Sequence, residues 1–151
     1  MGLSPQSRTA AGCSAVTRIT NLRLRTLIGF NPEERTKRQD IVINAEIHHR
    51  PTAAALNDDV GGALDYKTIT KAIIGHVEEG RFLLLEKLAG DLLDICTADP
   101  AVTRAAVTVD KPNALRFADS VSVTLELDKT KDQTTTEESH EERPRPLSKA
   151  S

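Results

Sequence analysis

Alternating apolar and polar residues predict four β-strands in this chain. In residues 16–28, the side chains of Leu22, Leu24 and Thr26 fall on one face, and arginines occupy the positions between them. The other three predicted strands, which alternate in the same way, are 40–48, 102–110 and 120–127. The first two are joined by a short charged connection, so we expect them to pair as a long antiparallel hairpin.

Between the second and third strands the apolar spacing changes to three and four residues, which predicts two helices. The first begins at Tyr66 and stops at Gly80, and the second begins near Leu84 and stops before Asp99 and Pro100. Residues 51–65 mix turn residues with short apolar side chains and are interpreted as a loop. The resulting order, β-β-α-α-β-β, predicts an α+β fold with an antiparallel four-stranded sheet and two helices on one face.

The two ends of the chain differ in composition from the region between them. Residues 1–15 are small and polar, and residues 128–151 contain a single leucine. Neither segment has enough apolar surface to offset the entropy lost on ordering, so both are predicted to be disordered tails. The folded domain is therefore expected to span residues 16–127.

The face of the predicted sheet that points away from the helices carries many charged and polar side chains. The edges of the sheet are long and contain no proline, which favours pairing with another copy of the chain. We therefore expect a closed homo-oligomer.

Composition excludes several other classes of protein. The formal net charge of −2 argues against a nucleic-acid-binding face, and no run approaches the roughly 20 apolar residues of a membrane span. Cys13 and Cys96 form neither a disulfide framework nor a metal-ligand spacing, and Cys96 is expected to be a small buried apolar residue. A reduced, cytoplasmic chain without metal or cofactor fits these features best.

Three residues interrupt the patterns at places where a functional side chain could lie. Lys111 ends the third long strand just before Pro112, and a lysine there could act as a base. Glu86 enters the first turn of the second helix, where a carboxylate could accept two N–H donors from a planar ligand. Tyr66, the only tyrosine, starts the first helix and could deliver a proton. Ordinary roles remain open for each: a solvated turn lysine, a carboxylate favoured by the helix dipole, and a packing residue.

Four segments of the chain, taken together, resemble the dihydroneopterin aldolase family, and within it the epimerase branch. They read NLRLRTLIGF with PEE, RQDIVINAEIHH, ALDYKTITKAIIGHVEEGRFLLLEKL and VDKPNALRFADSVSVTLEL, and they span about residues 17–127 in collinear order. The resemblance implies the T-fold, in which four sheets close into a barrel and two barrels stack as a homo-octamer. It also implies active sites between neighbouring subunits.

The resemblance assigns roles to the residues that the patterns single out. It implies that Glu86 anchors the pterin ring, with the backbone of Leu85 and Leu64 at the ring edge. Lys111 is similar to the general base of the family, and Tyr66, from the adjacent subunit, to its proton shuttle. Glu34, an ordinary loop charge by pattern alone, matches a glutamate near the side chain of the substrate.

These roles imply retro-aldol and aldol chemistry on a reduced pterin, with no cofactor. The epimerase branch converts 7,8-dihydroneopterin triphosphate to its 2'-epimer. The alternative is an aldolase of folate synthesis that releases glycolaldehyde, because the catalytic set is the same in both branches. A third alternative is an inactive pterin-binding scaffold, which the intact residue set disfavours.

A triphosphate substrate requires positively charged contacts that the resemblance does not assign. The candidates are Arg116, Lys37, Arg38 and Arg104. Arg116 is preferred among them because it lies close to Lys111 in the sequence. Residues of this kind are more often ordinary surface residues.

Overall fold

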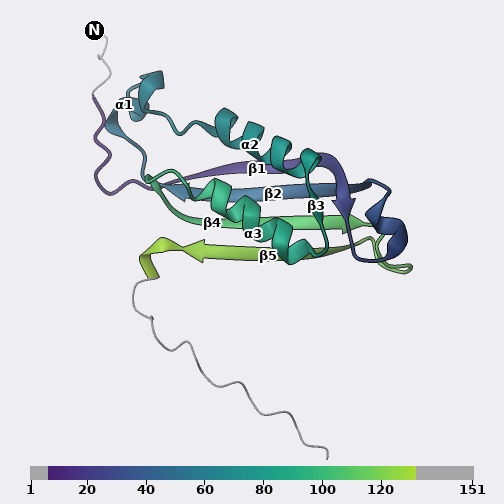
Figure 1. Ribbon diagram of the computed structural model, residues 1–151. Coiled ribbons are helices and arrows are strands. Elements are labelled where there is room, and N and C mark those ends of the chain that lie inside the picture. Colours follow the sequence, from purple (N-terminus) through teal and green to yellow (C-terminus); the bar gives the residue numbers. More distant parts are fainter. Residues whose placement is uncertain (1–6, 132–151) are drawn as a thin grey trace, which may run out of the picture.

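Two helices lie across one face of a five-stranded sheet in the computed structural model, which describes residues 7–131 (Figure 1). The strands are β1 (Ala15–Ile28), β2 (Gln39–His49), β3 (Arg81–Phe82), β4 (Val102–Pro112) and β5 (Ser120–Asp128). The helices are α1 (Ala53–Leu56), α2 (Tyr66–Glu79) and α3 (Leu85–Cys96), with short 3-10 turns η1 (Pro32–Arg35), η2 (Val60–Gly62) and η3 (Lys129–Lys131).

The sheet has the strand order β3-β1-β2-β4-β5. The four predicted strands are all present, and they pair antiparallel in the order β1-β2-β4-β5. The prediction of four strands is wrong by one, because Arg81 and Phe82 add a short strand that runs parallel to Leu27 and Ile28. Two residues are too few for an alternating pattern, so this strand has no sequence signal of its own.

A bulge divides β1 into two halves. The register with β2 shifts between Ile19 and Leu22, and Asn21 takes a positive φ of 54° there. The side-chain oxygen of Asn44 accepts a hydrogen bond of 2.8 Å from the Asn21 backbone. Because of the bulge, Ile19 and Leu22 both pack toward the core, so simple alternation does not hold through the whole strand.

The core lies between the sheet and helices α2 and α3. Its fully buried members include apolar residues of β2, β4 and both helices, as their spacing predicts: Ile41, Ile43, Ile47, Ile73, Val77, Leu88, Leu92, Val107 and Val109. Thr26 is also fully buried, and its hydroxyl donates a 2.6 Å hydrogen bond to the Val77 carbonyl, which ties β1 to α2. Cys96 is buried as predicted, and burial raises the pKa of its thiol to about 11.

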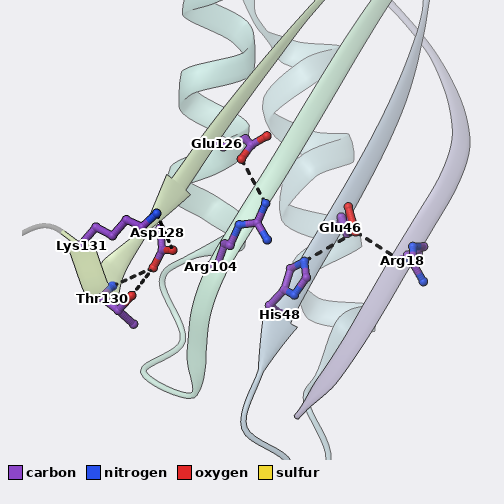
Figure 2. A network of polar contacts seen from close by, with 8 residues as sticks. All are labelled: Arg18, Glu46, His48, Arg104, Glu126, Asp128, Thr130 and Lys131. Atoms are coloured by element: carbon purple, nitrogen blue, oxygen red, sulfur yellow. Dashed lines mark hydrogen bonds and ion pairs between the residues drawn. The ribbon is translucent and has the colours of Figure 1, made fainter.

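The opposite face of the sheet carries rows of charged side chains (Figure 2). Arg18 pairs with Glu46 at 3.3 Å across β1 and β2, and Arg104 pairs with Glu126 at 3.1 Å across β4 and β5. His48 lies 3.6 Å from Glu46 and completes one row. The prediction that this face is polar and rich in paired charges is therefore confirmed.

Three local expectations change. The segment 51–65, predicted as a loop, contains α1 and η2. Residues 7–15 belonged to the predicted N-terminal tail, but Ala15 pairs with His49 and the Arg8 backbone donates to Asn57 at 2.8 Å. Residues 128–131 likewise complete β5 and form η3. Predicted disorder at residues 1–6 and 132–151 lies outside the described residues.

Within residues 7–131, no helix is long and apolar enough to cross a membrane.

Candidate active site

Lys111 and Glu34 form the most buried ion pair in the described part of the chain. Lys111 lies near the end of β4 and Glu34 in η1, and Nζ donates to Oε2 at 2.7 Å. Their side chains are only 12% and 21% exposed. The pKa of Glu34 lies below its ordinary value, mainly because Lys111 donates a hydrogen bond to its carboxylate. Hydrogen bonds from the Asn31 backbone and from Gln39 lower it further. The pair therefore places a lysine beside a permanently ionised carboxylate near neutral pH.

Gly29 and Gln39 fix the position of the Glu34 carboxylate. Gly29 has a φ of +127°, and a Cβ built at this position would overlap the carboxyl group of Glu34. Gln39 donates through Nε2 to the Ile28 carbonyl at 2.7 Å and to Glu34 Oε2 at 3.3 Å. The carboxylate thus lies directly against the backbone at the end of β1, a close approach that only glycine allows.

Leu85 and Glu86 lie at this same end of the sheet. The backbone N–H of Gly29 donates to the Phe82 carbonyl at 2.9 Å, which joins the end of β1 to β3. Helix α3 begins at Leu85, shortly after Phe82, and Glu86 lies in its first turn. Glu86 is exposed and Leu85 is partly buried. The start of α3 and the Glu34 loop are therefore held together through β3.

Tyr66 and Leu64 lie at the other end of the sheet. Both line a cavity of about 420 Å³ together with His49, at the end of β2, and Ala101, just before β4. Lys111 is near the far end of β4, and a strand of this length spans roughly 30 Å at about 3.3 Å per residue. The Tyr66 side chain is 53% exposed. A single subunit therefore does not bring Tyr66 to Lys111.

The positively charged residues that the sequence offered for contacts to a triphosphate lie in different parts of the fold. Arg116 lies in the β4–β5 loop with its guanidinium 5.3 Å from the ring centre of Phe117, which is 95% exposed. Arg38 donates to the Glu78 carbonyl at 3.0 Å, and Lys37 is exposed.

Arg104 is separated from the Lys111 pair. It lies near the start of β4 on the face away from the helices, where it is paired with Glu126 (Figure 2). Lys111 lies near the other end of the same strand, on the side of the core residues Val107 and Val109. Within one chain Arg104 therefore lies far from the Lys111 pair, and its contact with a polyphosphate stays a prediction.

Comparison with known proteins identifies the family. The family model described as "Dihydroneopterin aldolase" (FolB) matches residues 17–126. The chain is 55% identical over 112 residues to the dihydroneopterin triphosphate 2'-epimerase of Escherichia coli K12, covering 74% of this chain and 93% of that protein. It is 53% identical over 108 residues to the Pseudomonas aeruginosa enzyme of the same name, covering 72% and 88%.

The chain belongs to the dihydroneopterin aldolase family. Its fold agrees with that of the family: the crystal structure of E. coli dihydroneopterin aldolase in complex with neopterin aligns with a TM-score of 0.70 and 30% identity, over 75% of this chain and 98% of that one. The T-fold expected from the sequence is therefore confirmed. The match covers both ends of the sheet, so Lys111 and Tyr66 both lie within the family domain.

Sequence reasoning missed several residues of this dihydroneopterin aldolase-type site. Gln39 looked like part of a charged connection, although its amide holds Glu34. Arg35 and Arg81 were not singled out, yet both line a cavity of about 170 Å³ next to Glu34. No local pattern marks these residues, because the contacts join segments that are distant in sequence. Within residues 7–131, no three His, Cys, Asp or Glu side chains are grouped as metal ligands.

Proposed function

We propose that this chain is a dihydroneopterin triphosphate 2'-epimerase, an isomerase of pteridine metabolism. The identity to two epimerases is well above the identity to the aldolase of known structure. The structural observation that carries the proposal is the half-buried Lys111–Glu34 pair beside the start of α3. It combines a proton-transfer group with an exposed carboxylate, Glu86, that is available to a ligand.

Glu86 anchors the pterin ring in this proposal. Its carboxylate accepts from the 2-amino group and N3–H, two parallel donors that match the geometry of a carboxylate. The backbone of Leu85, together with that of Leu64 from the neighbouring subunit, completes the contacts at the ring edge. The ring is thereby oriented so that its side chain extends toward Lys111 and Glu34.

The reaction starts from the neutral amine of Lys111, formed when its ammonium group loses a proton to solvent. This amine takes the proton of the 2'-hydroxyl, directly or through a water molecule. The C1'–C2' bond then breaks, C2' becomes an aldehyde, and the electron pair moves into the C=N bond of the reduced ring. Glu34 holds the Lys111 ammonium group and contacts the hydroxylated side chain of the substrate. When the aldehyde turns and C1' attacks its opposite face, the bond re-forms with the configuration at C2' inverted. The ring itself accepts the electrons, so the proposal includes no cofactor.

A neighbouring subunit supplies Tyr66 to this site. Tyr66 and Lys111 lie at opposite ends of the sheet within one subunit. A site that contains both therefore draws them from two subunits. The outer edge of β1 is covered by β3 only at Leu27 and Ile28, and β5 has β4 as its one neighbour within residues 7–131. These edges favour closure of four sheets into a ring. We propose a homo-octamer of two stacked tetramers.

We assign the enzyme to the cytoplasm. Cys13 is exposed and Cys96 is buried, and both are free thiols. Free thiols of this kind are usual in a reducing compartment.

Aldol cleavage is a second activity of the same residues. If C1' of the intermediate is protonated before the aldehyde returns, the products are hydroxymethyl-dihydropterin and an aldehyde. Tyr66 is the group that we assign to this protonation. The kinship with dihydroneopterin aldolases supports such a side activity.

The proposal is tested by incubating the purified chain with 7,8-dihydroneopterin triphosphate and separating the pterin products. We expect the 2'-epimer as the main product, with cleaved pterin as a minor one. If cleavage predominates with both the phosphorylated and the unphosphorylated substrate, the chain is an aldolase. If neither product forms, the scaffold alternative holds.

A further inference from the structure

Arg35 and Arg81 line one cavity beside the catalytic pair, although they come from different segments. Arg35 is the last residue of η1, and Arg81 is the first residue of β3. The parallel pairing of β3 with the end of β1 brings them to a cavity of about 170 Å³ that Glu34 also lines. Its remaining lining residues are Leu27, Gly29, Phe82 and Leu83.

The residues that line this cavity carry a net positive charge, which favours an anionic ligand. Within residues 7–131, the ion-paired arginines are Arg18, Arg25 and Arg104. Neither Arg35 nor Arg81 has an ion-pair partner in that part of the chain. Glu34 is the one carboxylate among the residues that line the cavity, and Lys111 neutralises it at 2.7 Å. Two arginines without an ion-pair partner in residues 7–131 thus line a small space whose one carboxylate is already neutralised.

We propose that Arg35 and Arg81 bind the triphosphate of the substrate. The inference rests on the proposed function, in which Glu34 contacts the hydroxylated side chain of the pterin. The triphosphate is attached to C3', the next carbon after the one whose configuration changes. A substrate whose C2' hydroxyl lies at the Lys111–Glu34 pair therefore directs its phosphates into the space beyond Glu34. A guanidinium matches phosphate oxygens with two parallel N–H donors.

This assignment makes Arg35 and Arg81 determinants of specificity for phosphorylated over unphosphorylated pterins. Their guanidinium groups act on the part of the substrate that does not react. Their loss is therefore expected to weaken triphosphate binding and to leave the proton chemistry at Lys111 intact. Arg116, which the sequence favoured for this role, lies outside the lining of the cavity.

The experiment compares Arg35→Gln and Arg81→Gln with a matched control, Lys71→Gln, which removes one exposed positive charge from the middle of α2. Affinity is measured for dihydroneopterin triphosphate and for dihydroneopterin, together with kcat and KM for epimerisation. Each arginine variant should bind the triphosphate roughly 10- to 100-fold more weakly, the usual effect of losing hydrogen bonds to a charged group. Binding of dihydroneopterin should change less than about twofold, and Arg→Lys variants should recover part of the loss. Lys71→Gln should match the wild type with both ligands.

Equal losses for both ligands would mean that the arginines support the fold of the site, and the inference would be overturned. Unchanged triphosphate affinity in both variants would also overturn the inference. Failure of the proposed function gives a different result: the wild type forms no epimer. The binding measurements decide the role of the arginines in that case too, because they do not require turnover.

Discussion

Lys111 and Glu34 are 77 positions apart in the sequence, and their side chains meet at 2.7 Å where β4 ends beside η1. The pair joins the sheet to the loop that follows β1, at the end of the molecule where α3 begins. Catalysis, binding of the side chain and binding of the triphosphate all depend on this contact in our account.

Replacing Lys111 with alanine removes the base. We expect Lys111→Ala to slow epimerisation and cleavage together, by roughly 10²- to 10⁴-fold, because both begin with the same proton transfer. Affinity for the pterin should fall much less, since Glu86 still holds the ring. The measurement is kcat for both products together with the Kd of neopterin. Loss of one product alone would contradict a shared first step.

The Glu34 carboxylate should make stability depend on pH. Lys111 lowers the pKa of Glu34 in the folded protein below its ordinary value of 4.5. The unfolded chain therefore binds this proton first as the pH falls, so the stabilisation is complete above about pH 4.5 and is lost as the pH falls through the lower, folded-state pKa.

The measurement is the Tm of the wild type and of Glu34→Gln between pH 7 and pH 3. We expect the wild type to be more stable at pH 7, with the difference shrinking toward acid. Glu79→Gln, which removes one exposed carboxylate at the end of α2, serves as the matched control. A difference that is constant across this range would show that the ion pair does not contribute through ionisation of Glu34.

Glu86 is predicted to anchor the pterin. Glu86→Gln keeps the shape of the side chain but removes the charged acceptor, so affinity for the ring should fall at least about tenfold. The fold should persist, because a carboxylate in the first turn of a helix contributes only about 0.3–1 kcal/mol through the helix dipole. Titration with a guanine-like pterin analogue measures the effect. Unchanged affinity, with an intact circular dichroism spectrum, would remove Glu86 from the site.

Tyr66 and Lys111 should belong to different subunits of one active site. Tyr66→Phe is expected to lose cleavage far more than epimerisation, because only cleavage requires protonation of C1'. Lys111→Ala should lose both. When the two variants are unfolded together and refolded as mixed oligomers, some sites receive an intact lysine from one chain and an intact tyrosine from another. Cleavage should then recover to about a quarter of the wild-type value for random assembly.

Each variant refolded alone provides the control for the mixing experiment. A site built within one chain would always contain one of the two defects, so mixing would restore nothing. That result would overturn the division of the site between subunits. Equal loss of both products in Tyr66→Phe would instead remove the phenol from its role as the selective proton donor.

The sequence predicted the long elements well because their periodicity reflects burial against their own sheet. Ile41, Ile43 and Ile47 alternate because every second residue of β2 faces the helices. The bulge at Asn21 and the short strand at Arg81 and Phe82 depend on contacts with Asn44 and with β1, which no local pattern records.

The site was less predictable than the fold. Lys111, beside a proline, and Glu86, at a helix start, interrupt the pattern of apolar and polar positions in the sequence. Glu34 has no such signal and resembles an ordinary loop charge. Its importance follows from the Lys111 contact and from the close approach at Gly29, both of which form only in the folded chain. Family resemblance supplied its role, and local physical chemistry could not.

The most direct test of the central claim is to run the reaction in deuterated water with dihydroneopterin triphosphate as substrate. Reversible cleavage of the C1'–C2' bond leaves the hydrogen on C2' in place throughout. The account therefore predicts the 2'-epimer without deuterium at C2', and any hydroxymethyl product with one deuterium at C1'. NMR and mass spectrometry of the separated pterins measure both positions. An epimer that carries deuterium at C2', or no epimer at all, would contradict the account.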